Sequence, residues 1–283
     1  MALDLLVLRG LGLGDLLTGV PALRALRRAF PSHRLVLAAP EPYREILDGE
    51  ADAWLDVSGP GPVPAGRCDV AVNLHGRGPR SVAALRATRP RLLMSHTTGP
   101  AWDPGAHEVA RWCALLEWYG VPADPADLRL GSGDRTGPVV VHPGAASGAR
   151  RWPPERFAEV AAELDAVVTA GPGERDLARR VAGGRSVLLP SLRELADLVR
   201  DARLLICGDT GVAHLAAAFG TPSVVLFGPT PPALWGPPPG PHQVIWHGTT
   251  GDPHGAAPDP GLLKITVTEV LGAARRHLEV EAA

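Results

Sequence analysis

One carboxylate, Asp15, follows a glycine-rich turn near the N-terminus of the chain, in the stretch GLGLGD that begins at Gly10. An apolar run precedes this turn and a helical pattern follows it, so Asp15 is expected where a strand ends and a helix begins. A carboxylate in that place can accept a proton from a substrate hydroxyl as a general base. It can also simply cap the helix and complement its dipole. The residues alone leave both interpretations open.

The glycines of this turn do not form a dinucleotide-binding fingerprint. The pattern G-x-G-x-x-G needs a third glycine, and that position holds Asp15 when counted from Gly10 or Leu17 when counted from Gly12. A carboxylate would also repel a pyrophosphate group. The sequence contains no P-loop motif either. We therefore do not expect a dinucleotide here, and Asp15, with Gly14 before it, is either a carboxylate that faces a substrate or a helix cap.

The second half of the chain contains a loop of small residues followed by two arginines, in the string HPGAASGARRWPPERF. Backbone N–H groups around Gly144 and Ser147 can approach an anion closely because the side chains there are small. Arg150 and Arg151 add guanidinium groups that match phosphate oxygens. The loop therefore predicts a phosphate-binding element.

A second anion-binding pattern occurs in the string CGDTGVAHLAAAFG. Asp209 is expected to cap a helix that starts at Thr210 and Gly211, and the free N–H groups of a first helical turn attract anions. His214 lies one turn further on and shares a face with Thr210. Two such loops in one domain predict a nucleoside diphosphate as the ligand.

No group of histidines, cysteines and carboxylates has the spacing of a metal site, so we expect neither a metal nor a cofactor. The three cysteines, Cys68, Cys113 and Cys207, are odd in number and widely spaced. This pattern is typical of buried thiols in a reducing compartment.

The composition excludes several classes of protein. The net charge of −2 argues against nucleic-acid binding, and no apolar stretch is long enough for a membrane span. The N-terminus does not have the pattern of a signal peptide. We expect a cytoplasmic protein with at most peripheral membrane contact.

Short apolar runs alternate with helical patterns throughout, which is typical of an α/β protein with parallel sheets. The expected strands are 5–9, 34–39, 53–57, 69–74, 91–96, 139–144, 166–171, 186–190, 203–208, 223–228 and 243–248. The expected helices are 17–29, 42–48, 80–87, 106–119, 153–164, 174–182, 191–201, 211–219 and 265–280. The pattern predicts two tandem Rossmann-like, doubly wound domains facing a cleft.

Domain boundaries follow from composition. We expect an N-terminal acceptor-side domain over 1–125, a linker rich in proline, glycine and aspartate over 126–138, a donor domain over 139–264 and a C-terminal helix over 265–283. The segment 247–261 is expected to be a mobile loop, and no role is assigned to it.

Several of these motifs, in this order, resemble glycosyltransferase family 9, the heptosyltransferase-type enzymes of GT-B fold. The strings that carry the resemblance are GLGDLLTGVPALRALRRAFP, NLHGRGPRS, HPGAASGARRWPPERFAEVAAEL, DTGVAHLAAAFGTPSVVLFGPTPPALWGP and LLKITVTEVLGAA. They span most of the chain. In this family the C-terminal helix crosses back to the first domain, and the resemblance implies the same here.

The resemblance implies a metal-independent, inverting transfer of a sugar from a nucleotide-sugar, with ADP-heptose as the family's usual donor. Asp15 matches the family's general base, and Asp209, Thr210, Gly211 and His214 match its donor-binding motif. Arg150 stands where members usually have a lysine. His75 and Arg77 fall in the acceptor-side segment. The acceptor would be a hydroxyl of a glycan, a glycolipid or a small molecule.

One further departure and two alternatives accompany this hypothesis. The chain is short for the family in its N-terminal half, so a lipopolysaccharide-core acceptor does not follow from the resemblance. A nucleotide-sugar binding protein without catalysis would use the same second domain. A nucleotide-sugar epimerase or hydrolase would need further acid or base groups, for which His75, His142 and Glu108 are the candidates.

Overall fold

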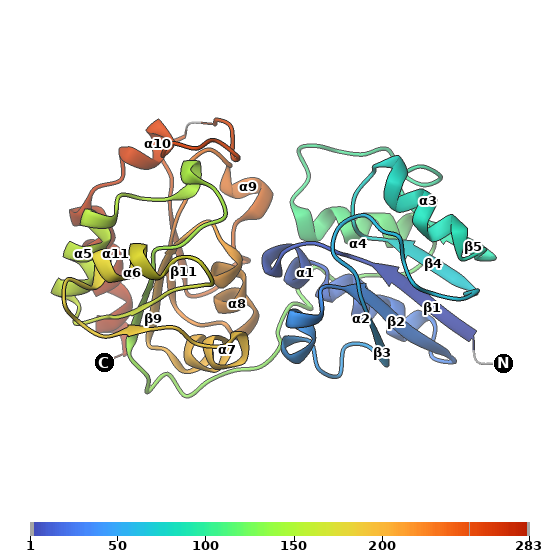
Figure 1. Ribbon diagram of the computed structural model, residues 1–283, viewed down its shortest axis with the longest axis horizontal. Coiled ribbons are helices and arrows are strands. Elements are labelled where there is room, and N and C mark those ends of the chain that lie inside the picture. The colour runs from blue at the N-terminus through green and yellow to red at the C-terminus, as the bar shows by residue number, and fades with distance from the viewer. Residues whose placement is uncertain (1–2, 249, 282–283) are drawn as a thin grey trace. The chain divides into compact units, whose positions relative to one another are not determined.

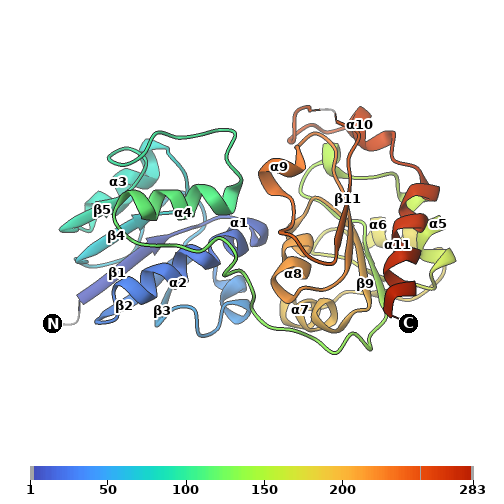
Figure 2. The ribbon, with the colours of Figure 1, turned by 180° about the vertical axis from the view of Figure 1, so that it is seen from behind.

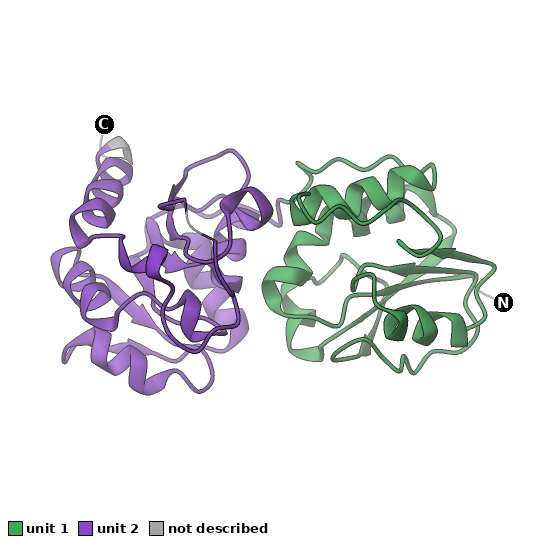
Figure 3. Ribbon diagram, turned by 90° about the horizontal axis from the view of Figure 1, so that it is seen from above, with its two compact units in different colours: residues 1–128 green, residues 129–283 purple. Residues whose placement is uncertain are grey.

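The structure is a computed structural model that describes residues 3–248 and 250–281. The chain divides into two compact units, residues 1–128 and 129–283 (Figure 3). Each unit is a parallel β-sheet with helices on both faces, so the predicted α/β class with two tandem Rossmann-like units is confirmed. Within the described residues, no helix has the length and apolar character needed to cross a membrane.

The first unit contains a five-stranded sheet in the order β3-β2-β1-β4-β5, in which neighbouring strands are parallel. Its strands are β1 Leu3–Leu8, β2 His33–Ala39, β3 Ala53–Asp56, β4 Val70–Asn73 and β5 Leu92–Met94. The middle strands are near-continuous apolar runs because helices or loops cover both faces of a parallel sheet.

Helices and one loop cover the two faces of this sheet. The helices are α1 Leu13–Thr18, α2 Val20–Ala29, α3 Pro79–Ala87 and α4 Glu108–Trp118, with a 3₁₀ segment, η1, at Glu41–Ile46. Helices α2 and α4 lie side by side on one face (Figure 2). On the other face, α3 and the proline-rich loop after β3 pack on Leu6, Val36 and Ala71 (Figure 1).

Two helix predictions for the first unit were wrong in detail. The helix expected over 17–29 is two helices divided at Gly19, where a side chain would collide with the Cδ of Arg9. The helix expected over 42–48 is the 3₁₀ segment η1, which starts at Glu41 and ends at Ile46, a short length typical of 3₁₀ segments.

The second unit contains a six-stranded parallel sheet in the order β11-β10-β9-β6-β7-β8. Its strands are β6 Val139–His142, β7 Val167–Thr169, β8 Val187–Leu188, β9 Leu204–Gly208, β10 Ser223–Leu226 and β11 His242–Ile245. Its longer helices are α5 Pro154–Glu163, α6 Arg175–Ala182, α7 Leu192–Asp201, α8 Gly211–Phe219 and α11 Val267–Glu281. Three short helical segments complete the unit: η2 Gly148–Arg150, α9 Pro232–Trp235 and α10 Pro260–Leu263.

The main core of the second unit lies between the sheet and the layer formed by α5, α6 and α11. Trp152 and Phe157 fill its centre, with ring centroids 4.9 Å apart, and the α11 residues Val270, Ala273 and Ala274 close it. Helix α11 therefore packs on α5 and the sheet of its own unit. The crossing of this helix to the first unit stays a prediction.

The segment expected to be a linker is held against the second unit over its last ten residues. Arg135 donates hydrogen bonds to the carbonyls of Arg200 and Phe219 and, at 2.8 Å, to the hydroxyl of Thr221. The N–H of Leu130 binds the carbonyl of Ala218 at 2.9 Å. The compact units accordingly divide after residue 128.

Both sheets have the strand order of a doubly wound fold, which reverses direction between β1 and β4 in the first unit and between β6 and β9 in the second. Ligands of such folds bind beyond the C-terminal ends of the strands at this reversal. Asp15 follows β1 and His75 follows β4, while the two anion-binding strings follow β6 and β9. The fold thus places Asp15, His75 and the starts of both anion-binding loops at a switch point of one sheet or the other.

Candidate functional site

Asp15 lies in the first turn of α1, half-buried, just beyond the C-terminal end of β1. The turn before it passes close to the loop after β3, since a Cβ on Gly10 would come within 2.5 Å of the Gly59 carbonyl oxygen. Gly12 is the N-cap residue of α1, and no side chain caps the helix there. The short glycine turn therefore fixes where Asp15 emerges from the sheet.

A buried arginine, Arg9, lies directly beneath this turn. Its guanidinium donates to the backbone carbonyls of Asp15 and Leu74, to the Thr18 hydroxyl at 2.8 Å and to the Glu108 carboxylate at 3.1 Å. The residue is only 1% exposed. Sequence reasoning missed Arg9, although a charged residue directly after the four apolar residues 5–8 is a signal that could have identified it.

Glu108 is shared between two arginines and an indole at the start of α4. Besides Arg9, it accepts from Arg111 and, at 2.8 Å, from the Nε1 of Trp112. The guanidinium carbons of Arg9 and Arg111 lie 4.9 and 4.3 Å from the ring centroids of Trp112 and Trp102. Glu108, one acid or base candidate of an epimerase, is thus held in an ion-pair network.

Burial raises the pKa of Asp15 above its ordinary value. The positive charge of Arg9 lowers that pKa, and the negative charge of Glu108 raises it further. A raised pKa brings a carboxylate closer to the range in which it serves as a general base near neutral pH.

Two acceptor-side candidates lie just after β4. The backbone N–H of His75 donates to the Asn73 side chain at 3.1 Å, but no described residue gives its buried Nδ1 a hydrogen bond. Burial, with smaller effects from Arg9 and Arg80, lowers the pKa of His75, which favours its neutral form. Arg77 is exposed and lies over Trp102, 5.6 Å from its centroid.

In the second unit, the loop after β6 begins at a buried histidine and a crowded glycine. His142 contacts the Thr169 hydroxyl at 3.0 Å through Nδ1, and burial lowers its pKa to about 4. The Glu174 carboxylate occupies the space where a Cβ on Gly144 would stand, and it accepts from the N–H of Gly171 at 3.0 Å. Glu174 is a residue at this loop that sequence reasoning missed.

Arg150 joins the two predicted anion-binding loops. Its Nη1 lies 3.3 Å from the carbonyl oxygen of Asp209 and 3.7 Å from its carboxylate, while no described residue binds its buried Nε. Gly208 permits this approach, since a Cβ there would come within 3.0 Å of the Arg150 carbonyl oxygen. Arg151 turns back, and its Nε donates to the Ala145 carbonyl at 3.0 Å.

The start of α8 differs in one detail from the expectation. Thr210, not Asp209, is the N-cap residue of this helix, and its hydroxyl makes no capping hydrogen bond. The N-cap side chain therefore does not occupy the N–H groups of the first turn, which begins at Gly211. His214 lies further along α8, where its ring meets that of Trp235 edge-on with centroids 6.0 Å apart.

The segment 251–259, given no role from the sequence, packs against the loop after β6. The Ser147 hydroxyl donates to the Pro253 carbonyl at 2.5 Å, and the Ala149 N–H donates to the Gly255 carbonyl at 2.9 Å. A Cβ on Gly148 would overlap the carbonyl of Ala256. The hydroxyl proton of Ser147 is thus engaged, so this side chain offers a ligand only its lone pairs.

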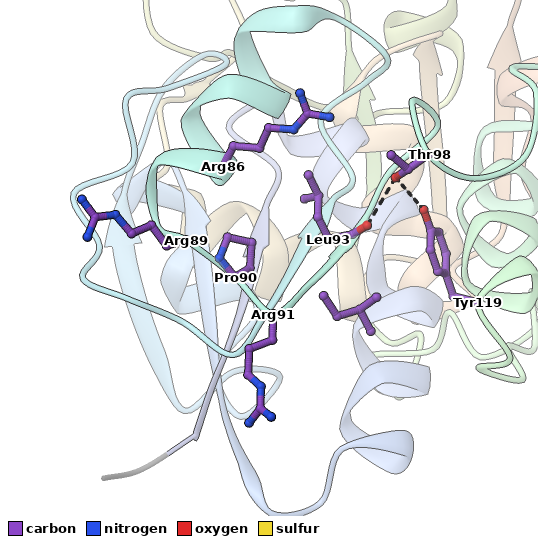
Figure 4. A pocket seen from close by; sticks show the side chains of 8 residues that line it. Arg86, Arg89, Pro90, Arg91, Leu93, Thr98 and Tyr119 are labelled. Carbon is purple, nitrogen blue, oxygen red and sulfur yellow. Dashed lines mark hydrogen bonds between the residues drawn. The ribbon is translucent and has the colours of Figure 1, made fainter.

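A hollow of about 480 Å³ lies along the edge strand β5 of the first sheet (Figure 4). Arg86, Arg89 and Arg91 line it, but their guanidinium groups point away from one another. Arg91 also lies 3.6 Å from the Asp69 carboxylate. These arginines do not converge on one anion. Among the described residues, no three histidines, cysteines or carboxylates are grouped to hold a metal ion.

Sequence comparison identifies relatives of this chain. The family model described as Glycosyltransferase family 9 (heptosyltransferase) matches residues 92–255, more than half of the chain. Lipopolysaccharide heptosyltransferase 1 of Pseudomonas aeruginosa is 31% identical over 155 residues, which are 48% of this chain and 43% of that protein. The Escherichia coli K12 protein of the same name is 33% identical over 97 residues, 31% of this chain and 30% of that protein. The chain thus matches less than half the length of these relatives.

Solved structures share the whole fold. A family 9 glycosyltransferase from Veillonella parvula superposes with a TM-score of 0.78 at 22% identity, covering 98% of both chains. Escherichia coli ADP-heptose lipopolysaccharide heptosyltransferase II gives a TM-score of 0.77 at 18% identity, covering 99% of this chain and all of that one. The predicted GT-B fold is confirmed by these superpositions, and the chain belongs to glycosyltransferase family 9 (heptosyltransferase).

Proposed function

We propose that this protein is an inverting glycosyltransferase that transfers heptose from ADP-heptose to a hydroxyl of a lipopolysaccharide-type or related glycan acceptor. The single observation that carries the proposal is the half-buried Asp15, with a raised pKa, at the switch point of a family 9 fold. The donor is suggested by relatives, since one solved structure is described as an ADP-heptose heptosyltransferase and another as heptosyltransferase WaaC with ADP.

In the proposed reaction, Asp15 accepts the proton of the acceptor hydroxyl as its oxygen attacks the anomeric carbon. The new carbon–oxygen bond forms as the bond to the diphosphate breaks, and ADP leaves with the electron pair. One displacement inverts the anomeric centre. The described residues around Asp15 include Glu108 as a second buried carboxylate, but two arginines hold it, so it is not available as a nucleophile for a double displacement.

The leaving diphosphate needs positive groups, which the second unit supplies. Arg150, Arg151 and the uncapped N–H groups at Thr210 and Gly211 would bind its oxygens. Gly144 and Ser147 would line the loop, and Asp209 and His214 would flank the donor. This assignment requires no metal ion and no cofactor.

The acceptor side would be formed in the first unit by Gly14, His75 and Arg77 beside Asp15. Transfer requires the two units to come together around both substrates, which is the usual role of closure in two-domain enzymes.

We further propose domains over 1–125 and 139–264, joined by a linker over 126–138 and followed by the helix from 265. We also propose a cytoplasmic protein with at most peripheral membrane contact.

The test compares Asp15→Asn with wild type, using Asp48→Asn, an exposed carboxylate of the same unit, as the matched control. Transfer from ADP-heptose to a heptose-deficient lipopolysaccharide is expected to fall by about 10²-fold or more in Asp15→Asn, because general-base catalysis contributes about 10²–10⁴-fold. ADP affinity, measured by calorimetry, should stay at the wild-type value in both variants.

Three results would contradict the proposal. Undiminished transfer by Asp15→Asn would remove Asp15 from the role of base. Turnover of ADP-heptose that is the same with and without an acceptor would favour an epimerase or a hydrolase, and ADP binding without turnover in wild type would favour a binding protein.

A further inference from the structure

Arg9 connects three parts of the first unit that meet beneath Asp15. Its Nε binds the Asp15 carbonyl at the start of α1, and its Nη1 binds the Leu74 carbonyl at the end of β4. Its Nη2 reaches Glu108 at the start of α4. One guanidinium thus holds the two switch-point strands and a helix start in a single arrangement.

The site is shaped to admit this side chain. Helix α1 ends and α2 begins at Gly19, where a Cβ would lie 2.9 Å from the Arg9 Cδ and 3.1 Å from its Nε. Thr18 contributes its hydroxyl as both an acceptor from Arg9 and a donor to the Asp15 carbonyl, at 2.8 and 2.7 Å. The break between the two helices is therefore where the guanidinium passes.

The charges of this buried group do not balance without Asp15. Arg9 and Arg111 bring two positive charges and Glu108 brings one negative charge, and all three residues are less than a tenth exposed. An isolated buried charge is costly, so one further anion nearby is favourable. The ionised Asp15 carboxylate, which interacts electrostatically with Arg9 and Glu108, supplies it. Further charged or titratable groups near this region include His75, which interacts with Arg9 and Arg80, and His96, which interacts with Arg111 and Glu108.

We propose that Arg9, held by Glu108, is a positioning residue for Asp15. Arg9 fixes the backbone from which the Asp15 carboxylate projects, and its positive charge keeps that carboxylate ionised. Its catalytic meaning rests on the proposed function of Asp15 as the base. A lysine could supply the charge but not the several directed hydrogen bonds, because its ammonium lacks the planar fork of a guanidinium.

The test is a titration of the Asp15 carboxyl by ¹³C NMR in the full chain, with the signal assigned by its loss in Asp15→Asn. Arg9→Met is expected to raise the pKa of Asp15 by about 1 unit or more, the effect of removing an adjacent opposite charge. Arg9→Lys should leave this pKa close to wild type while lowering kcat. The acid limb of the kcat profile should move to higher pH by the same amount as the NMR pKa in Arg9→Met.

Two further variants keep the test decisive. Arg24→Met removes another partly buried arginine of this unit, which pairs with Glu50 and Asp127, and should not change the pKa of Asp15. Glu108→Gln removes the negative neighbour and should lower that pKa, so it tests the same cluster in the opposite direction if Arg9→Met does not fold.

An unchanged Asp15 pKa in folded Arg9→Met or Glu108→Gln would overturn the inference. Failure of the proposed function is seen separately, because Asp15→Asn would then keep full transfer activity. In that case a shifted carboxyl titration would still establish that Arg9 controls Asp15.

Discussion

At the scale of single residues, the chemistry of this protein depends on how each charged group is already occupied. The Arg150 side chain is tied at one end to Asp209, through a carbonyl at 3.3 Å and a carboxylate at 3.7 Å, and is 23% exposed. Its Nε has no partner among the described residues. A guanidinium can keep the Asp209 contacts and still offer donors to a diphosphate, whereas a lysine ammonium has one nitrogen for both. Arginine is therefore compatible with the proposed role of binding the donor diphosphate at this position, where members of the family usually have lysine.

Arg150 is expected to contribute to the affinity for ADP. Arg150→Ala is expected to weaken ADP binding by about tenfold or more, because a hydrogen bond to a charged group contributes about 1.5–3 kcal/mol. Arg185→Ala, an exposed arginine of the same unit, is the matched control and should bind ADP as wild type does. Calorimetry at one fixed salt concentration measures both. Equal ADP affinity in Arg150→Ala and Arg185→Ala would exclude Arg150 from the diphosphate site.

At the scale of elements, sequence patterns predicted the order of strands and helices because each depends on local periodicity and turn residues. Apolar runs predicted the strands, proline predicted the start of α5, and glycine predicted the end of α8. The pairing of Arg9 with Glu108 could not be predicted, since 99 residues separate them and only the folded sheet brings them together. The same is true of Ser147 and Pro253, which lie 106 residues apart. Long-range polar contacts carry no periodic signal in one sequence.

A glycine substitution tests the long-range contact of the segment 251–259. Gly148→Ala places a methyl group against the Ala256 carbonyl, so the segment must move away from the loop after β6. We expect the second unit to lose about 1–3 kcal/mol of unfolding free energy, as in overpacked sites, and ADP affinity to fall with it. Gly131→Ala, whose Cβ would make only an ordinary contact with Phe219 at 3.9 Å, is the control. Urea unfolding of both variants measures the difference. A Gly148→Ala protein as stable as Gly131→Ala would show that the packing is not needed.

At the scale of the whole molecule, the chain consists of two units that each contain their own sheet, core and half of the proposed chemistry. The second unit has a pH dependence that follows from two buried histidines. Two histidines of the second unit, His142 and His242, have pKa values lowered to about 4, in both cases chiefly by burial. Both rings are therefore neutral in the folded unit at any pH above about 4. In the unfolded chain each takes up a proton below about pH 6.5.

Because the unfolded chain then binds more protons than the folded unit, the stability of the second unit must fall as the pH drops from about 6.5 to 4. A pKa difference of this size corresponds to about 3 kcal/mol for His142 across the window. His142→Gln should therefore lose less stability than wild type between pH 7 and pH 5. His254→Gln, which replaces an exposed histidine on the segment 251–259, is the matched control. Hydrogen exchange of peptides from β6 and β9 during urea titration reads the second unit directly. Parallel pH dependences in wild type and His142→Gln would mean that His142 is not held neutral by the fold, and that the loop after β6 can accept a positive charge at its base.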